Sequence, residues 1–170
     1  MDLILRKLNS GDEEIFLRSL ERWDNHPDFL FSQGFLPSMT FQEYLSLLDS
    51  HEKGELLPEG YVPYSTFCGF GGQEIVGRVS LRHQLNDFLY KRGGNIGYGV
   101  LPDYRFNGYG REMLLKALVE AKKLGLLKVL LTCDKSNIGS IRTIESNGGV
   151  LENQIDSESI LPLRYWIDLN

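Results

Sequence analysis

The run RFNGYG, residues 105–110, places Gly108 and Gly110 where a helical pattern begins, between the basic residues Arg105 and Arg111. The first amide N–H groups of a helix have no partner inside it and lie at the positive end of its dipole. Glycine removes the Cβ that would hold an anion away from them, so the run predicts a phosphate-binding loop. Its expected donors are consecutive backbone amides, those of Phe106, Asn107, Gly108, Tyr109, Gly110 and Arg111. A tight strand-to-helix turn also accounts for two glycines here.

The elements beside this loop are those that an anion-binding helix start requires. Residues 95–101 predict a strand that Pro102 ends, and residues 128–134 predict a buried strand. Between them lies an amphipathic helix that Gly125 ends, with an apolar face of Met113, Leu114, Ala117, Leu118, Ala121 and Leu124. The loop is not a dinucleotide fingerprint, which needs G-x-G-x-x-G, nor a P-loop, which needs G-K-[ST].

Two further helices come early in the chain, and each begins at a capping-box pattern, Ser10 with Glu13 and Thr40 with Glu43. Short helices are expected within residues 84–94 and 136–149. Short apolar runs predict strands at residues 3–8, 62–70, 74–83, 150–155 and 161–169. No repeat or linker interrupts this order, so we expect one mixed α/β domain over residues 1–170.

Bulk composition narrows the class of protein. The chain has 170 residues, 42% of them hydrophobic and 24% charged, which is typical of a soluble globular domain. A formal net charge of -5 argues against nucleic-acid binding, and no apolar run is long enough for a membrane span. The start has no secretory pattern, and Cys68 and Cys133 are interpreted as buried thiols, so we expect a cytoplasmic protein. No metal-ligand spacing is found, so no metal site is expected.

Over about residues 95–150 the chain resembles the core of the GNAT superfamily of N-acetyltransferases. In that family a Q/R-x-x-G-x-G/A loop binds the pyrophosphate of acetyl-CoA, and its fixed positions are taken here by Arg105, Gly108 and Gly110. The family then carries an asparagine, a small residue, a glutamate and a glycine, and the run NIGSIRTIESNGG supplies Asn137, Ser140, Glu145 and Gly148 or Gly149.

The resemblance implies a fold and a set of cofactor contacts. The implied fold is α/β (α+β mixed), with a single mixed, mostly antiparallel sheet of about seven strands and about four flanking helices. A central parallel pair of strands splays, so that Tyr98, Gly99 and Val100 are expected to pair with the pantetheine arm as an added strand would. The Tyr98 amide would then stabilise the oxyanion at the thioester carbonyl. Asn137 and Ser140 are expected beside the same arm.

The implied function is acetyl-CoA-dependent N-acetylation of a primary amine on a small molecule or peptide, by direct attack in a ternary complex. Dimers are frequent in the family, which leaves a homodimer open. Two other functions remain open at this point. One is a catalytically weak acyl-CoA-binding sensor, and the other is a phosphate-binding α/β protein unrelated to acyl transfer.

The catalytic groups depart from the family pattern. The tyrosine that many relatives use to protonate the leaving thiolate is replaced by Ile144. The thiolate would then leave unassisted, take a proton from water, or take one from Tyr98 or Tyr109. Relatives place a glutamate base near the positions of Gly94 and Thr132.

Two residues are therefore candidate bases, each with a structural alternative. His83 titrates in a suitable range, but a surface or capping histidine is the simpler interpretation. Asp134 could act through water, but a cap for the following helix is again simpler. His26, Asp156 and Glu158 lie in loops that could face an acceptor.

Two further groups of residues were weighed for function. An acceptor pocket could be lined by aromatic residues of the early loop, although core packing suits most of them: Trp23, Phe29, Phe31 and Phe35. Cys133 is interpreted as a buried strand residue, because no histidine is paired with it in sequence to make it a nucleophile.

Overall fold

The computed structural model describes residues 2–24, 31, 32, 34–154 and 162–170. Within these residues the strands are β1 (Leu3–Arg6), β2 (Tyr64–Gly71), β3 (Glu74–Arg82), β4 (Ile96–Val100), β5 (Lys128–Asp134), β6 (Val150–Gln154) and β7 (Pro162–Asp168). The α-helices are α1 (Glu13–Asp24), α2 (Phe41–Lys53), α3 (Asp87–Lys91), α4 (Tyr109–Lys123) and α5 (Ile138–Glu145). These are five helices in the described ranges, where about four were expected.

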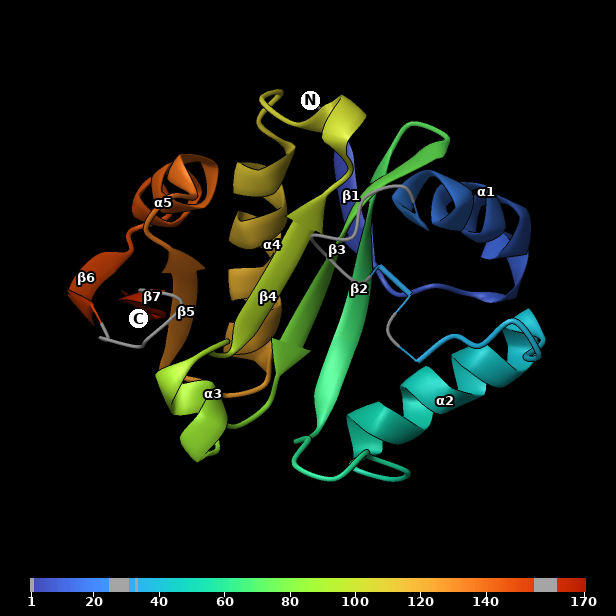
Figure 1. Cartoon of the computed structure of the whole chain (residues 1–170), viewed down its shortest axis with the longest axis horizontal. Coiled ribbons are helices and arrows are strands. Elements are labelled where there is room, and N and C mark those ends of the chain that lie inside the picture. Colours follow the sequence, from blue (N-terminus) through green and yellow to red (C-terminus); the bar gives the residue numbers. More distant parts are fainter. Residues whose placement is uncertain (1, 25–30, 33, 155–161) are drawn as a thin grey trace.

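The strands form two hydrogen-bonded sheets instead of the single sheet expected. One is antiparallel with the order β1-β2-β3-β4, and the other has the order β5-β7-β6. The strands β4 and β5 lie at the edges of their sheets, and Figure 1 shows them side by side and pointing in the same direction. The residue just before β4 is bonded to β5, because the Asn95 N–H donates to the Leu130 carbonyl at 2.7 Å. The Leu130 N–H donates in turn to Oδ1 of Asn95, at 2.9 Å.

Asn95 explains why the two sheets separate. Its side chain takes the place of a ladder carbonyl toward Leu130, and its own carbonyl accepts the Arg82 N–H at 2.7 Å. After Asn95 the backbone of β4 therefore pairs with β3, and among the described residues no ladder joins β4 to β5. Gly94 before it has a φ of 62° and sits so close to Leu130 that a Cβ would lie 2.1 Å from the Leu130 oxygen.

Helices cover both faces of the four-stranded sheet (Figure 1). On one face, α1 and α2 bury an aromatic cluster of Phe16, Trp23, Phe31, Phe41 and Tyr44. On the other face, α4 packs against both sheets through Met113, Leu114, Ala117, Leu118 and Ala121. Full burial of an apolar side chain of leucine or phenylalanine size contributes roughly 1.5–3 kcal/mol, so these clusters fix the helices on the sheet.

Helix ends follow the sequence signals with one shift. Thr40 and Glu43 form the predicted capping box of α2. The first box is formed by Asn9 and Asp12 and not by Ser10 and Glu13, so that prediction is wrong by one position. Asn9 is as good an N-cap as serine, and Asp12 is held by two hydrogen bonds from Arg6, at 2.6 and 2.8 Å.

Candidate functional site

A hollow of about 610 Å³ lies where β4, the loop of residues 101–108, the start of α4 and the start of α5 meet. Its lining includes every predicted cofactor-binding residue except Asn107 and Tyr109. It also includes four residues that sequence reasoning missed, Ile138, Gly139, Arg142 and Thr143 of α5. The fold thus brings the glycine-rich loop and the later asparagine-containing helix to one place.

The start of α4 is open toward this hollow. Gly108 is the N-cap, with a φ of 82°, and no side chain caps the helix. The first hydrogen bond of the helix runs from the Glu112 N–H to the Gly108 carbonyl, at 3.2 Å. The amides of Tyr109, Gly110 and Arg111 therefore have no partner inside the helix, and they present partial positive charge to an anion.

Gly108 and Gly110 are present for different physical reasons. The positive φ of Gly108 is one that other residues rarely adopt, so the turn alone requires glycine there. At Gly110, an added Cβ would lie 3.5 Å from Oγ1 of Thr143 and 3.6 Å from Cγ2 of Val100, which is ordinary contact. A tight turn therefore explains Gly108, but protein packing does not require glycine at position 110.

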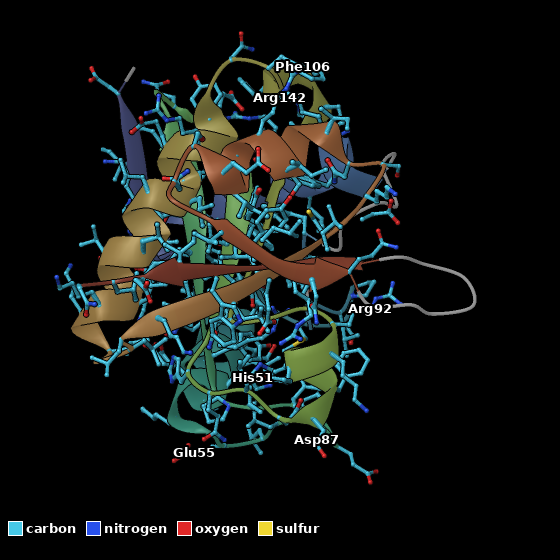
Figure 2. The ribbon with its side chains drawn as sticks, turned by 90° about the vertical axis from the view of Figure 1, so that its left-hand side faces the viewer. His51, Glu55, Asp87, Arg92, Phe106 and Arg142 are labelled. Atoms are coloured by element: carbon cyan, nitrogen blue, oxygen red, sulfur yellow. The ribbon has the colours of Figure 1, made fainter. Side chains whose placement is uncertain are left out.

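Positive charge gathers around the hollow although the chain as a whole is acidic. Its lining holds Arg105, Arg111 and Arg142, and none of the three takes part in an ion pair among the described residues. Arg105 Nε donates to the Val100 carbonyl at 3.0 Å, which ties the loop to the end of β4. Figure 2 shows Arg142 on α5 next to Phe106, whose side chain is 99% exposed. Arginine on an exposed helix face is common, so no sequence signal marked Arg142.

Strand β4 directs alternate backbone groups toward the opening beside it. The Leu101 N–H donates to the Val76 carbonyl, and the Arg82 N–H donates to the Asn95 carbonyl. In an antiparallel ladder this alternation turns the amides of Tyr98 and Val100 away from β3, toward β5. The Tyr98 amide, predicted as an oxyanion donor, therefore faces the space between the two sheets.

Three other predicted cofactor residues have local bonds of their own. Oδ1 of Asn137 caps α5 by accepting the Ser140 N–H at 3.0 Å, which leaves the Nδ2 donors for a ligand. Nδ2 of Asn107 donates to the Arg105 carbonyl at 3.2 Å and stabilises the turn. The Tyr109 ring packs edge-on against Tyr104, with centroids 5.8 Å apart, and its hydroxyl lies beside the β2–β3 hairpin.

Neither candidate base lines the hollow. His83 follows β3 four residues after Val79, the ladder partner of Tyr98, which places it roughly 13 Å along the strand. Its Nε2 lies 2.8 Å from Oγ of Ser65. Oδ1 of Asp134 accepts hydrogen bonds from the hydroxyl and the amide of Ser136, which hold the pKa of that carboxyl below its usual value. Neither side chain takes the capping role weighed for it, because Asn137 and not Asp134 is the N-cap of α5, and His83 is half-buried against Ser65.

The positions where relatives carry catalytic groups hold none here. Ile144 is fully buried in the core. Oγ1 of Thr132 accepts the Gly93 N–H at 2.8 Å, and Gly94 has no space for a side chain. Cys133 is buried, and burial raises the pKa of its thiol, so it is a poor nucleophile.

Most of the residues weighed for an acceptor pocket pack in the core or lie outside the described ranges. Trp23 and Phe31 stack with ring centroids 5.1 Å apart, and Phe35 packs edge-on against Phe16. His26, Phe29, Asp156 and Glu158 fall outside the residues that the structure describes.

Neither a metal-binding cluster nor a membrane-spanning helix is found in the described part of the chain. Residues 2–24, 31, 32, 34–154 and 162–170 contain no group of three or more histidine, cysteine or acidic side chains placed to hold a metal ion. Over the same ranges, no helix combines the length and the apolar character that crossing a bilayer demands.

Comparison with known proteins places the fold. The family model described as "Acetyltransferase (GNAT) domain" matches residues 2–150. No curated protein sequence matches, but solved structures do. A GNAT-family acetyltransferase from Streptococcus pneumoniae is 19% identical with a TM-score of 0.68, covering 99% of this chain and 100% of its own. An acetyltransferase from Salmonella typhimurium, solved with acetyl-CoA, is 14% identical (TM-score 0.64; 99% and 94% covered). A mutant of spermidine N-acetyltransferase from Vibrio cholerae is 21% identical (TM-score 0.64; 98% and 94% covered).

Proposed function

The chain belongs to the GNAT acetyltransferase family, and from this premise we propose that it transfers the acetyl group of acetyl-CoA to a primary amine. The observation that carries this proposal is the uncapped start of α4, which opens into a hollow lined by three arginines without ion-pair partners among the described residues. An anion with several phosphate groups suits such a site, because backbone amides and guanidinium groups both donate to phosphate oxygens.

We assign the binding roles as follows. The amides of Tyr109, Gly110 and Arg111 take the pyrophosphate, and Arg105, Arg111 and Arg142 neutralise the phosphate charges. The pantetheine arm extends along β4, whose outward backbone groups accept it as an added strand. Asn137 donates to the same arm through Nδ2.

The acetyl group is then presented in the opening between the two sheets. There the Tyr98 amide donates to the thioester carbonyl oxygen, and removing one such donor typically costs about 3 kcal/mol of transition-state stabilisation. The amine attacks the carbonyl carbon directly. A covalent acetyl-enzyme is disfavoured, because the thiol nearest the hollow, Cys133, is buried and its pKa is raised.

The acceptor is proposed only as a class, a primary amine of a small molecule or peptide. A structural neighbour named for spermidine supports an amine over an alcohol. Among the described residues, no carboxylate or imidazole lines the hollow, and this favours a second candidate, an acyl-CoA sensor without turnover.

One experiment separates the two functions. The purified chain is titrated with acetyl-CoA, and thiol release is then followed across polyamines, aminoglycosides, amino acids and peptides with free N-termini. Binding followed by release with at least one amine supports the transferase. Tight binding without release for any amine supports the sensor. Failure of acetyl-CoA to bind, with ATP or NAD stabilising the chain instead, would refute both.

A further inference from the structure

The side chain of Tyr98 reaches from β4 to α5, and it lines the hollow. Its hydroxyl lies 3.0 Å from Oγ of Ser140, and Ser140 and Thr143 also line the hollow. Tyr98 thus offers two donors in different directions. Its amide faces the opening beside β4, and its phenol contacts Ser140 of α5, which also lines the hollow.

The other groups that could protonate a leaving thiolate are absent from this place. Ile144, where relatives carry a tyrosine, is fully buried and has no proton to give. Tyr109 turns its ring toward Tyr104, away from the hollow. Of the described residues that line the hollow, Tyr98 alone carries a phenol, and none carries an imidazole or a carboxyl group.

We propose that the Tyr98 hydroxyl is the catalytic acid that protonates the departing thiolate of coenzyme A, with Ser140 as its proton relay. This inference rests on the proposed function. The acceptor nitrogen forms a bond to the thioester carbon, the carbon–sulfur bond breaks, and its electron pair stays on sulfur. Sulfur takes the Tyr98 proton, the phenol oxygen takes the Ser140 proton, and water in the hollow restores Ser140. The amine nitrogen releases its extra proton to water.

The relay matters because a phenol is a weak acid. Burial raises the pKa of Tyr98 to about 12, so the hydroxyl stays protonated at neutral pH and is always available as a donor. Forming a free phenolate would be unfavourable, since thiols titrate near 8.5. Ser140 donates to the phenol oxygen as the phenol proton moves to sulfur, and the proton that the amine nitrogen releases returns to Ser140 through water, so that neither phenolate nor alkoxide accumulates.

Replacement of Tyr98 with phenylalanine tests the proposal while leaving the backbone amide and most of the ring packing in place. We expect kcat with acetyl-CoA to fall about 100-fold, the lower end for loss of a general acid, while acetyl-CoA affinity changes little. With the selenium analogue of acetyl-CoA, whose selenolate leaves without needing a proton, Tyr98→Phe should react nearly as fast as the wild type. A purely structural defect would slow both substrates alike.

A second readout does not depend on turnover. Thiol ionisation of bound coenzyme A is followed by the ultraviolet absorbance of the thiolate. A hydrogen bond from Tyr98 should lower the thiol pKa by about one unit relative to the Tyr98→Phe complex. Ser140→Ala, which keeps the phenol and removes the relay, should lower kcat about tenfold.

Tyr165 supplies the matched control. It is also a buried tyrosine whose hydroxyl donates to α5, to Oε1 of Glu145 at 3.3 Å, but it does not line the hollow. Tyr165→Phe should keep kcat within about twofold. The inference is overturned if Tyr98→Phe keeps kcat within threefold of the wild type, or if the selenium ester does not rescue it. Absence of turnover in the wild type would instead refute the proposed function.

Discussion

Two hollows of this protein are lined by charged and polar side chains. They differ in whether those side chains are already bonded to other groups of the protein. The smaller, of about 300 Å³, lies between α2, residues 7–10 and Thr66 of β2. Lys7 and Glu52, which line it, pair with each other, and Oε1 of Glu52 also accepts the hydroxyl of Ser65 at 2.9 Å. Ser65 bonds in turn to His83, and both of these residues lie outside the lining. The larger hollow, at the start of α4, has helix amides without partners in the helix and three arginines without ion pairs in the described ranges.

The difference indicates where a ligand can gain binding energy. At the smaller hollow a ligand would have to break bonds that already exist, and leaving a buried polar group unsatisfied costs about 1–3 kcal/mol. At the larger hollow it would add bonds to groups now facing water. Polar residues mark a functional site here only where the fold leaves them without internal partners.

Among the substitutions that test this comparison of the two hollows, the largest effect should follow from Gly110→Ala. The added methyl group fits the protein, and alanine is favoured over glycine in a helix by up to about 1 kcal/mol, so the free chain should keep or raise its melting temperature. The same methyl group lies among the helix-start amides, so acetyl-CoA affinity should fall tenfold or more, a loss of about 1.4 kcal/mol. Calorimetry on the free and ligand-bound chain measures both.

The control for this substitution is Lys116→Ala, on α4 but outside the lining of the hollow. It should leave affinity unchanged. An unaltered affinity in Gly110→Ala would mean that the helix start does not bind the pyrophosphate. Gly108 is a poorer choice for the test, because a side chain at its φ of 82° strains the fold itself.

Loss of one arginine should have a smaller effect. Arg142→Gln removes a cation that faces the hollow, and we expect acetyl-CoA affinity to fall about three- to tenfold, with a weaker dependence on salt. Figure 2 shows Arg92 far below Arg142, near α3, and it does not line the hollow. Arg92→Gln should therefore leave the affinity and its salt dependence as they are. Equal losses of affinity in both variants would indicate that the net charge of the protein matters, and not the position of Arg142 at the hollow.

His83, which bonds to Ser65, should matter for stability and little for activity. His83→Gln loses the bond to Ser65, so the melting temperature should fall by about 2–4 °C. His83 lies four residues beyond Val79, the ladder partner of Tyr98, so kcat should change less than threefold and the pH profile of kcat should keep its shape. Loss of activity together with the loss of a pH limb near neutrality would restore His83 as the base.

The smallest effect concerns the pH dependence of folding. His51 is buried, with Nδ1 2.7 Å from the Tyr64 hydroxyl and Nε2 3.2 Å from the Leu56 carbonyl. Burial lowers the pKa of His51, so below about pH 6.5 the unfolded chain takes up a proton more readily than the folded one. The free energy of unfolding should then decrease as pH falls from 6.5, and it should decrease more in the wild type than in His51→Gln. Urea denaturation of both proteins at several pH values checks this. The same dependence of the free energy of unfolding on pH in the wild type and in His51→Gln would contradict it.

The fold was largely readable from local signals. Strand β5 has the predicted bounds, Thr40 caps α2, and Gly125 ends the α4 region with a φ of 80°. The division into two sheets was not readable. It depends on the side chain of Asn95 replacing a backbone carbonyl toward Leu130, which is a tertiary contact and leaves no trace in a strand pattern.

The site was readable where the sequence is constrained by the backbone. Gly108 and Gly110 marked the helix start, and Asn137 was predicted as a cofactor residue, whereas its role as the N-cap of α5 was not predicted. Arg142 and Thr143 were missed, because only the packing of α5 beside β4 shows which face of that helix meets the hollow. The side-chain position of Tyr98 against Ser140 likewise required the three-dimensional fold.

Nuclear magnetic resonance of backbone amides during titration with coenzyme A tests the central claim most directly. We predict that the Tyr109, Gly110 and Arg111 amide protons shift downfield and become protected from exchange, since they would donate to phosphate oxygens. The amides around Ser65 and His83 should stay unchanged. Shifts confined to that second region, with the α4 start unaffected, would contradict the account.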